Sequence, residues 1–200
     1  MHLWTIQRKE VWDLLQAEGT LFVPPRKWTP PSYVWIQGQF RERVAGYQGN
    51  LPWWAHCKKP RLSLHRDSYH YREKFVRLEL VVPDKRVLSF PCWAWDRVFC
   101  QDYLAVTKRE YENWETTLAA AGVTEDDYPL PQPWQNKMRK SWLRLFDPNL
   151  PRTTWDSDGF WKASTCREAV FESLNLKQVR SVAVARGKSQ RTYSTLYKGQ

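Results

Sequence analysis

The side chains best suited to chemistry in this chain gather between residues 56 and 70. His56 and Cys57 are adjacent, and His65 and His70 follow along the same stretch. Imidazole nitrogens and thiolate sulfurs are the ligands that hold zinc tetrahedrally. The spacing of these four residues matches none of the short ligand pairs that preorganise a zinc site, so we predict no metal centre.

Motifs for the common reaction types do not occur in the chain. It contains no Gly-x-Ser-x-Gly elbow, no Walker glycine loop and no Gly-x-Gly-x-x-Gly fingerprint. An ordinary hydrolase or a nucleoside-triphosphate enzyme is therefore disfavoured. We predict no cofactor from the motifs, and they leave open whether the protein is an enzyme.

Basic residues interleave with aromatic ones in two stretches, residues 53–61 and 186–198. This combination suits phosphate contacts together with stacking on nucleic-acid bases. We predict that both stretches contribute to one basic face that binds nucleic acid or another polyanion. The residues predicted for this face are Lys58, Lys59, Arg61, Arg180, Arg186, Lys188 and Arg191.

The formal net charge of +10 is unevenly distributed. No acidic residue follows Glu172, whereas residues 110–127 are locally acidic. A segregated positive field attracts nucleic acids and acidic protein surfaces alike, so an interaction protein that docks on an acidic partner remains an alternative. A third reading is that the basic surface keeps a tryptophan-heavy core soluble.

Composition indicates one domain over residues 1–200, with a basic, flexible tail at 187–200. The chain of 200 residues is 42% hydrophobic and contains 13 tryptophans, whose large rings suit a Trp-rich core. No apolar run is long enough for a signal peptide or a membrane span, and the four cysteines are scattered. We therefore expect a cytoplasmic protein without membrane contact, in which Cys92 and Cys100 are core thiols. The oligomeric state is not indicated.

The clearest local structure lies between residues 74 and 100. Side chains alternate over 74–82, with Val76, Leu78, Leu80 and Val82 on one face, which is typical of a half-buried strand. Pro83-Asp84-Lys85 predicts a turn, so residues 86–90 are expected to return and pair with the first strand as a β-hairpin. A helix from Pro91 would then place Trp95 and Phe99 against that hairpin.

Further elements flank this hairpin. We predict strands at 2–6, 21–23 and 178–186, and an ambiguous segment at 51–55. Helices are predicted after Thr5 up to Gly19, after Ser32, after Thr107 up to about residue 121, from Pro133, and after Thr165, where Glu168 completes a capping box. The mixed order of strands and helices predicts an α+β fold with a central antiparallel hairpin or sheet packed by amphipathic helices.

Three segments together resemble a known family. They are Leu3-Trp4-Thr5-Ile6-Gln7, the stretch from Leu78 to Ser89 that reads LELVVPDKRVLS, and SWLRLFD at 141–147. This pattern resembles the bacterial and phage family numbered 3841 among the domains of unknown function, a resemblance that brings no established activity. Where that family has an aspartate and a glutamate, this chain has Phe90 and Leu143.

The order of an opening strand, a helix ending at Gly19, a short strand and a later LELVVPDKRVLS segment is also similar to ADP-ribosyltransferase-like domains. That resemblance implies a nucleotide cleft between two small sheets with NAD as the cofactor. Glu79 would be the candidate catalytic acid that orients the ribose, and Gln7 and Arg41 would contact phosphate or ribose. The alternative is that Glu79 lies on a solvated strand face and pairs with Arg77 or Lys85.

Overall fold

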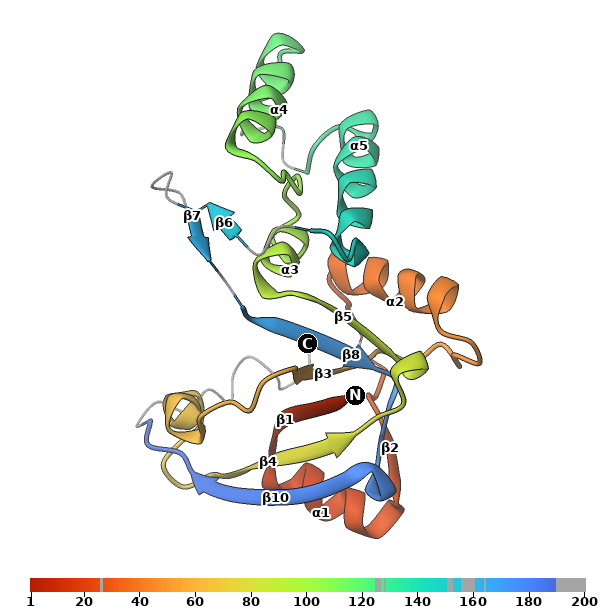
Figure 1. The fold of residues 1–200 in the computed structure, drawn as a ribbon, viewed down its shortest axis with the longest axis vertical. Helices are drawn as coiled ribbons and strands as arrows, with labels where there is room; N and C mark the ends of the chain where they lie inside the picture. The colour runs from red at the N-terminus through yellow and green to blue at the C-terminus, as the bar shows by residue number, and fades with distance from the viewer. Residues whose placement is uncertain are drawn as a thin grey trace. The chain divides into compact units, whose positions relative to one another are not determined.

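The structure is a computed structural model that describes residues 1–25, 27–124, 127, 129–150, 153–155, 161–163 and 165–189 (Figure 1). The chain divides into two compact units. One, the sheet unit, comprises Met1–Ser89 and Arg167–Gln200. The other, the helical unit, comprises Phe90–Cys166. Among the described residues no helix is long and apolar enough to span a membrane.

The sheet unit is built on a six-stranded sheet with the order β10-β4-β1-β3-β8-β5. Within it, β1 pairs antiparallel with β3 and β4, β10 with β4, and β3 with β8. The antiparallel sheet and its helices confirm the predicted α+β class. The strands are β1 His2–Arg8, β3 Trp53–His56, β4 Lys74–Val81, β5 Val87–Pro91, β8 Arg167–Phe171 and β10 Val179–Arg186.

The predicted hairpin of β4 with β5 is wrong. β4 pairs with β1 and β10, whereas β5 lies at the opposite edge of the sheet beside β8. The short 3₁₀ helix η2 (Asp84–Arg86) does turn the chain after Pro83, as its residue types predict. A turn sets the local path but not the pairing partner. Here seven residues of β1 pair with β4 from His2↔Val81 to Arg8↔Phe75, which is more than the five residues of β5 could match.

The predicted inward face of β4 is confirmed, but its predicted packing partners are wrong. Val76, Leu78 and Leu80 are fully buried and Val82 is 1% exposed. They form a core cluster with residues of β1, β8 and the helix α1 (Lys9–Glu18), which lies along the sheet below β4 in Figure 1. Trp95 instead contacts Phe90 and Phe99 within the helical unit, and Phe99 is 49% exposed.

The capping residues predicted for the helices of the sheet unit are only partly confirmed. Gly19 ends α1 in the left-handed conformation with φ 74°, as predicted. Thr5 does not cap this helix, because it lies inside β1 and its Oγ1 donates to the carbonyl of Trp54. Ser32 is a buried residue within α2 (Pro31–Arg43) rather than its N-cap. The predicted strand near 21–23 is β2 (Thr20–Phe22), which pairs with β9 (Ser173–Asn175).

The helical unit carries much of the aromatic core. Trp93, Trp95, Trp114 and Trp142 are all buried there. Thr107 caps α4 by accepting from the backbone N–H of Glu110, as predicted. The elements of this unit are α3 Cys92–Phe99, α4 Lys108–Ala120, α5 Gln132–Trp142, the 3₁₀ helix η4 Leu143–Phe146, and the paired strands β6 Thr153–Trp155 and β7 Trp161–Ala163.

The helix predicted after Thr165 is also wrong, because residues 167–171 form β8. The spacing of Thr165 and Glu168 matches that of a capping box, although a strand and not a helix follows. Ala169, Val170 and Phe171 are buried consecutively, since both faces of this interior strand are covered. A strand that is buried on both faces reads as a continuous apolar run, which periodicity cannot distinguish from a buried helix. The strand predicted at 178–186 is confirmed as β10.

The cysteine prediction requires correction. Cys92 forms a disulfide with Cys166, and Cys100 is exposed, so neither is a core thiol. A separation of 74 residues leaves no spacing signal in the sequence. The expected cytoplasmic location stays a prediction. Of the tail expected to be flexible at 187–200, residues 190–200 lie outside the described residues.

Candidate nucleic-acid interface

The predicted basic residues come together where the 3₁₀ helix η1 (Leu62–Ser68) meets the end of β10. Arg66 Nε donates to the carbonyl oxygen of Arg186 at 3.1 Å, and the backbone N–H of Lys188 donates to the carbonyl of Arg66 at 2.9 Å. Figure 1 shows the C-terminal end of β10 beside the gold helix η1. Two distant basic segments of the sequence thus form one surface.

The run that precedes η1 is attached to the same part of the sheet. Arg77, on β4, donates from its guanidinium to the carbonyl oxygen of Pro60 at 2.8 Å. This hydrogen bond holds the chain between β3 and η1 against the strand that pairs with β10. Lys58, Lys59 and Arg61 extend from this segment with exposed side chains.

Two predicted residues fall outside this cluster. Arg180 is exposed at the opposite end of β10, where the register shifts between Val179 and Ser181. Since Val179 pairs near Leu80 while Arg186 pairs with Lys74, Arg180 is separated from η1 by most of the strand. Arg191 lies outside the described residues.

Acidic neighbours neutralise little of this surface. Lys188 Nζ lies 3.2 Å from the carboxylate of Asp67, and both side chains are exposed. Such a surface pair contributes little to stability and leaves both groups hydrated. Within the described part of the chain, Lys59, Arg61 and Arg186 make no ion pair. The surface therefore retains positive charge for an external anion.

A cavity of about 220 Å³ opens next to this surface, and two histidines line it. The rings of His56 and His65 are 5.8 Å apart between centroids. Burial lowers the pKa of both imidazoles, and charge repulsion from His65 lowers the pKa of His56 further. Glu168 on β8 pairs in register with His56 on β3 and lines the same cavity, as do Thr5, Gln7, Ser68 and Tyr69.

The other two residues of the predicted histidine–cysteine group do not line this cavity. Burial raises the pKa of the Cys57 thiol, which lies against the main core cluster. The ring of His70 packs 4.4 Å from that of Tyr71. Among the described residues, no group of three or more His, Cys, Asp or Glu side chains could hold a metal ion.

The three residues suggested by the ADP-ribosyltransferase resemblance are not brought to one cavity. Glu79 accepts a hydrogen bond from Ser181 Oγ at 2.7 Å and lies 3.7 Å from His2 Nδ1. Gln7 donates to Thr5 Oγ1 and lines the histidine cavity, which neither Glu79 nor Arg41 lines. Arg41 is exposed on α2. Glu79 thus pairs across the strand face, with partners other than Arg77 or Lys85.

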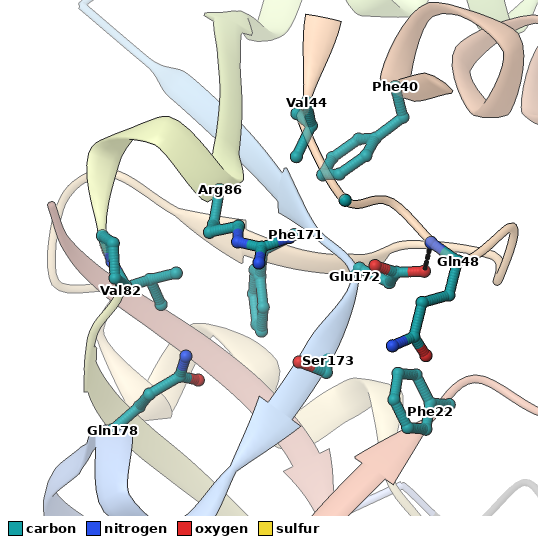
Figure 2. Close-up of a pocket in the computed structure, with 12 residues that line it drawn as sticks. Phe22, Phe40, Val44, Gln48, Val82, Arg86, Phe171, Glu172, Ser173 and Gln178 are labelled. Carbon is teal, nitrogen blue, oxygen red and sulfur yellow. Dashed lines mark hydrogen bonds between the residues drawn. The ribbon is translucent and has the colours of Figure 1, made fainter. Parts of the chain in front are cut away.

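A second cavity, of about 250 Å³, contains Arg86 and Glu172 (Figure 2). Arg86 donates to the carbonyl of Ala45 at 2.8 Å, and the Glu172 carboxylate accepts from the backbone N–H of Gln48 at 2.7 Å. Asn50 also donates to Glu172 through its side-chain amide. Both charges therefore hold the chain that follows α2, and we assign this cavity a structural role.

A third cavity, of about 380 Å³, lies within the helical unit and combines aromatic rings with cations. Tyr103 stacks on Trp114 with centroids 4.5 Å apart, and Lys137 Nζ lies 4.1 Å above the ring of Trp134. The Arg144 guanidinium, which also lines it, is bound to the carboxylate of Glu110. The sequence did not predict this cavity, because its only local signal is the spacing of Trp134 and Lys137 on one helix face.

Comparisons with known proteins identify a family and no individual relative. No curated protein and no solved structure matches the chain, so nothing supports an ADP-ribosyltransferase fold. A family model described as "Domain of unknown function (DUF3841)" matches residues 2–170. That range covers most of the chain and includes the three segments on which the predicted resemblance rests. The protein belongs to the DUF3841 family of domains of unknown function.

Proposed function

We propose that the protein binds nucleic acid through the surface formed by η1, the run before it and the end of β10. The observation that carries this proposal is the contact of Arg66 with Arg186, which merges two basic segments into one surface. We call this surface the basic face. Its members are Lys58, Lys59, Arg61, Arg66, Arg186 and Lys188.

Electrostatics favours a polymeric anion for this face. Each phosphate that a lysine or arginine contacts releases condensed counterions, and this release supplies most of the sequence-independent affinity for nucleic acids. The exposed ammonium and guanidinium groups of Lys59, Arg61 and Arg186 are free to move onto successive phosphates. Binding should therefore depend steeply on salt and weakly on base sequence.

The test compares two charge-matched variants by fluorescence anisotropy with labelled single- and double-stranded DNA and RNA at several salt concentrations. Lys59→Gln with Arg186→Gln removes two cations from the basic face. Lys85→Gln with Lys177→Gln removes two exposed cations from η2 and from the 3₁₀ helix η5 (Leu176–Gln178). With double-stranded DNA we expect the first variant to lower the slope of log affinity against log salt by about 1.8, at about 0.9 per phosphate contact, and with single strands by about 1.4, at about 0.7 per contact; the second variant should leave both slopes unchanged.

Two results would contradict the proposal. One is that the wild type binds none of the four polymers at low salt. The other is that both variants change affinity equally, which would mean that net charge alone attracts the polymer. Copurification with one acidic protein, without affinity for nucleic acid, would favour the docking function instead.

A further inference from the structure

We propose that the cavity lined by His56 and His65 cleaves RNA, with the two imidazoles exchanging protons with the ribose and the leaving oxygen. This inference rests on the proposed binding of nucleic acid and assigns to that binding a substrate class. The substrate is a ribose phosphodiester, because the reaction uses the ribose 2′-hydroxyl as its nucleophile.

The location of the cavity supports this assignment. His56 ends β3 and His65 lies in η1, so the segment between them carries Lys58, Lys59 and Arg61. Arg66, which follows His65 directly, makes the hydrogen bond to Arg186 that joins the basic face. A strand held by its phosphates on the basic face therefore passes over a chain segment that has an imidazole at each end.

The size of the cavity agrees with a polymeric substrate. At about 220 Å³ it is smaller than the roughly 300–1,000 Å³ of sites that enclose a whole drug-sized ligand. It has room for a phosphate and its sugar, while the rest of the strand lies outside. Tyr69 and Trp54 add aromatic surface to its wall, and Ser68 adds a hydroxyl group.

The chemistry is balanced without a metal, a cofactor or an oxidant. A neutral imidazole removes the proton of the 2′-hydroxyl while its oxygen forms a bond to phosphorus. The bond from phosphorus to the 5′-oxygen breaks, and that oxygen takes a proton from the second, protonated imidazole. The products are a 2′,3′-cyclic phosphate and a free 5′-hydroxyl, and paired acid–base groups of this kind typically accelerate a reaction by about 10²–10⁴-fold each.

The surroundings of the two rings assign their roles. Burial and the nearby His65 both lower the pKa of His56, which favours the neutral form that acts as base. Only burial lowers the pKa of His65, and an approaching phosphate would raise it again, so His65 is the acid. Among the described residues, the other ionisable groups that line the cavity are Glu168 from β8 and Tyr69, which follows η1. Because both pKa values are lowered in the free protein, kcat/KM should peak on the acidic side of the ordinary histidine value of 6.5 and fall on both sides.

The experiment incubates the whole protein with a mixed-sequence RNA of about 30 nucleotides and, separately, with the all-deoxy strand of the same sequence. A chelator is present throughout, and binding is measured alongside cleavage. We expect RNA fragments with 2′,3′-cyclic phosphate ends and a bound but intact DNA strand. His56→Gln and His65→Gln should each lower the cleavage rate about 10²-fold or more, with RNA affinity changed less than about twofold. His70→Gln, on the same stretch but outside the cavity, is the matched control and should keep the wild-type rate.

Each outcome separates this proposal from the proposed binding. Binding of RNA without cleavage between about pH 5 and 7 overturns the cleavage and leaves the binding intact. Cleavage that survives in both histidine variants identifies a contaminant and also overturns it. No binding of either strand overturns both proposals. Circular dichroism checks the folding of each variant, and the His65 change, in a surface 3₁₀ helix, tests the idea even if His56→Gln unfolds.

Discussion

Arg66 Nε donates a hydrogen bond of 3.1 Å to the carbonyl oxygen of Arg186, across 120 positions of the chain. Two like charges would separate if only electrostatics acted on them. The hydrogen bond to a carbonyl holds the Arg66 guanidinium in place, and its free energy offsets part of the repulsion between the positive charges. We call this contact of Arg66 with Arg186 the clamp. The backbone bond from Lys188 to Arg66 strengthens the same contact.

This clamp makes a prediction about local stability. Arg66→Met removes the side-chain donor, and we expect the Lys188 amide, which donates to the Arg66 carbonyl, to exchange about 2- to 12-fold faster with solvent deuterium. That factor corresponds to about 0.5–1.5 kcal/mol, the usual net contribution of one hydrogen bond to stability. Lys59→Met removes a neighbouring charge without a clamp and should not change this exchange. Equal protection in both variants would show that the clamp is not needed.

The inward face of β4 predicts a large difference between two truncations. Leu78→Ala deletes a fully buried side chain and should lower the free energy of unfolding by about 2–5 kcal/mol. Val184→Ala, on the adjoining edge strand, removes a side chain that is 55% exposed and should change it by about 0.5 kcal/mol or less. Urea denaturation measures both. Similar losses in the two variants would mean that the register of β4 is misassigned.

Glu172 should hold the backbone of the chain that follows α2 in one conformation (Figure 2). Glu172→Gln weakens charge-assisted hydrogen bonds to Gln48 and Asn50, so we expect faster amide exchange at those two residues and a loss of about 1.5–3 kcal/mol at most. Gln178→Ala, in the wall of the same cavity, is the control and should leave both amides protected. Unchanged exchange in Glu172→Gln would remove the structural role assigned to this carboxylate.

Acid should weaken the helical unit through Glu110. Burial opposes ionisation of this carboxyl, but the Val106 N–H and the Arg144 guanidinium outweigh burial and lower its pKa below the ordinary 4.5. A depressed folded pKa gives stability that is present above the unfolded value and is lost as pH falls through the folded value. We therefore expect Glu110→Gln to be less stable than the wild type near pH 7, and the difference in melting temperature to shrink below about pH 4.5. A gap that stays constant down to pH 3 or so would contradict this account.

The disulfide should stabilise the helical unit. Cys92–Cys166 closes a long loop, and opening it gives the unfolded chain more freedom, typically worth about 2–4 kcal/mol. Dithiothreitol should lower the melting temperature of the wild type and leave a Cys92→Ser, Cys166→Ser double variant unchanged. Mass spectrometry after alkylation reports which thiols are reactive, and labelling of Cys92 without reductant would show that the bond is not formed.

Sequence reasoning succeeded where a signal lies within a few residues of its effect. The left-handed Gly19, the Thr107 cap and the alternation from Val76 to Val82 each act within one turn or one strand, and each is confirmed. It failed where the partner is distant. β4 pairs with β1 and β10 rather than with β5, which follows it in the chain, and Cys92 is bonded to Cys166. Such long-range pairings depend on the packing of the whole core.

The candidate site divides in the same way. The runs of basic residues correctly predicted that Arg186 and Lys188 share a face with the chain near η1. They also predicted Arg180 there, but the strand register puts this residue at the far end of β10. His56 and His65 were recognisable only as possible metal ligands, since no spacing rule describes two rings that meet across a cavity. Cavities are properties of packed surfaces, so sequence patterns predict their chemistry better than their existence.

β5 and β8 are neighbours in the sheet, and all of the chain from α3 to β7 is inserted between them. The insertion begins and ends at one point, where the backbone N–H of Cys92 donates to the carbonyl of Cys166 at 3.2 Å. A short reverse turn could bridge that point without moving any strand. The helical unit is thus a topological insertion between two neighbouring strands, so the strand pairings of β1, β3, β4 and β10, on which the basic face is built, involve no residue of it.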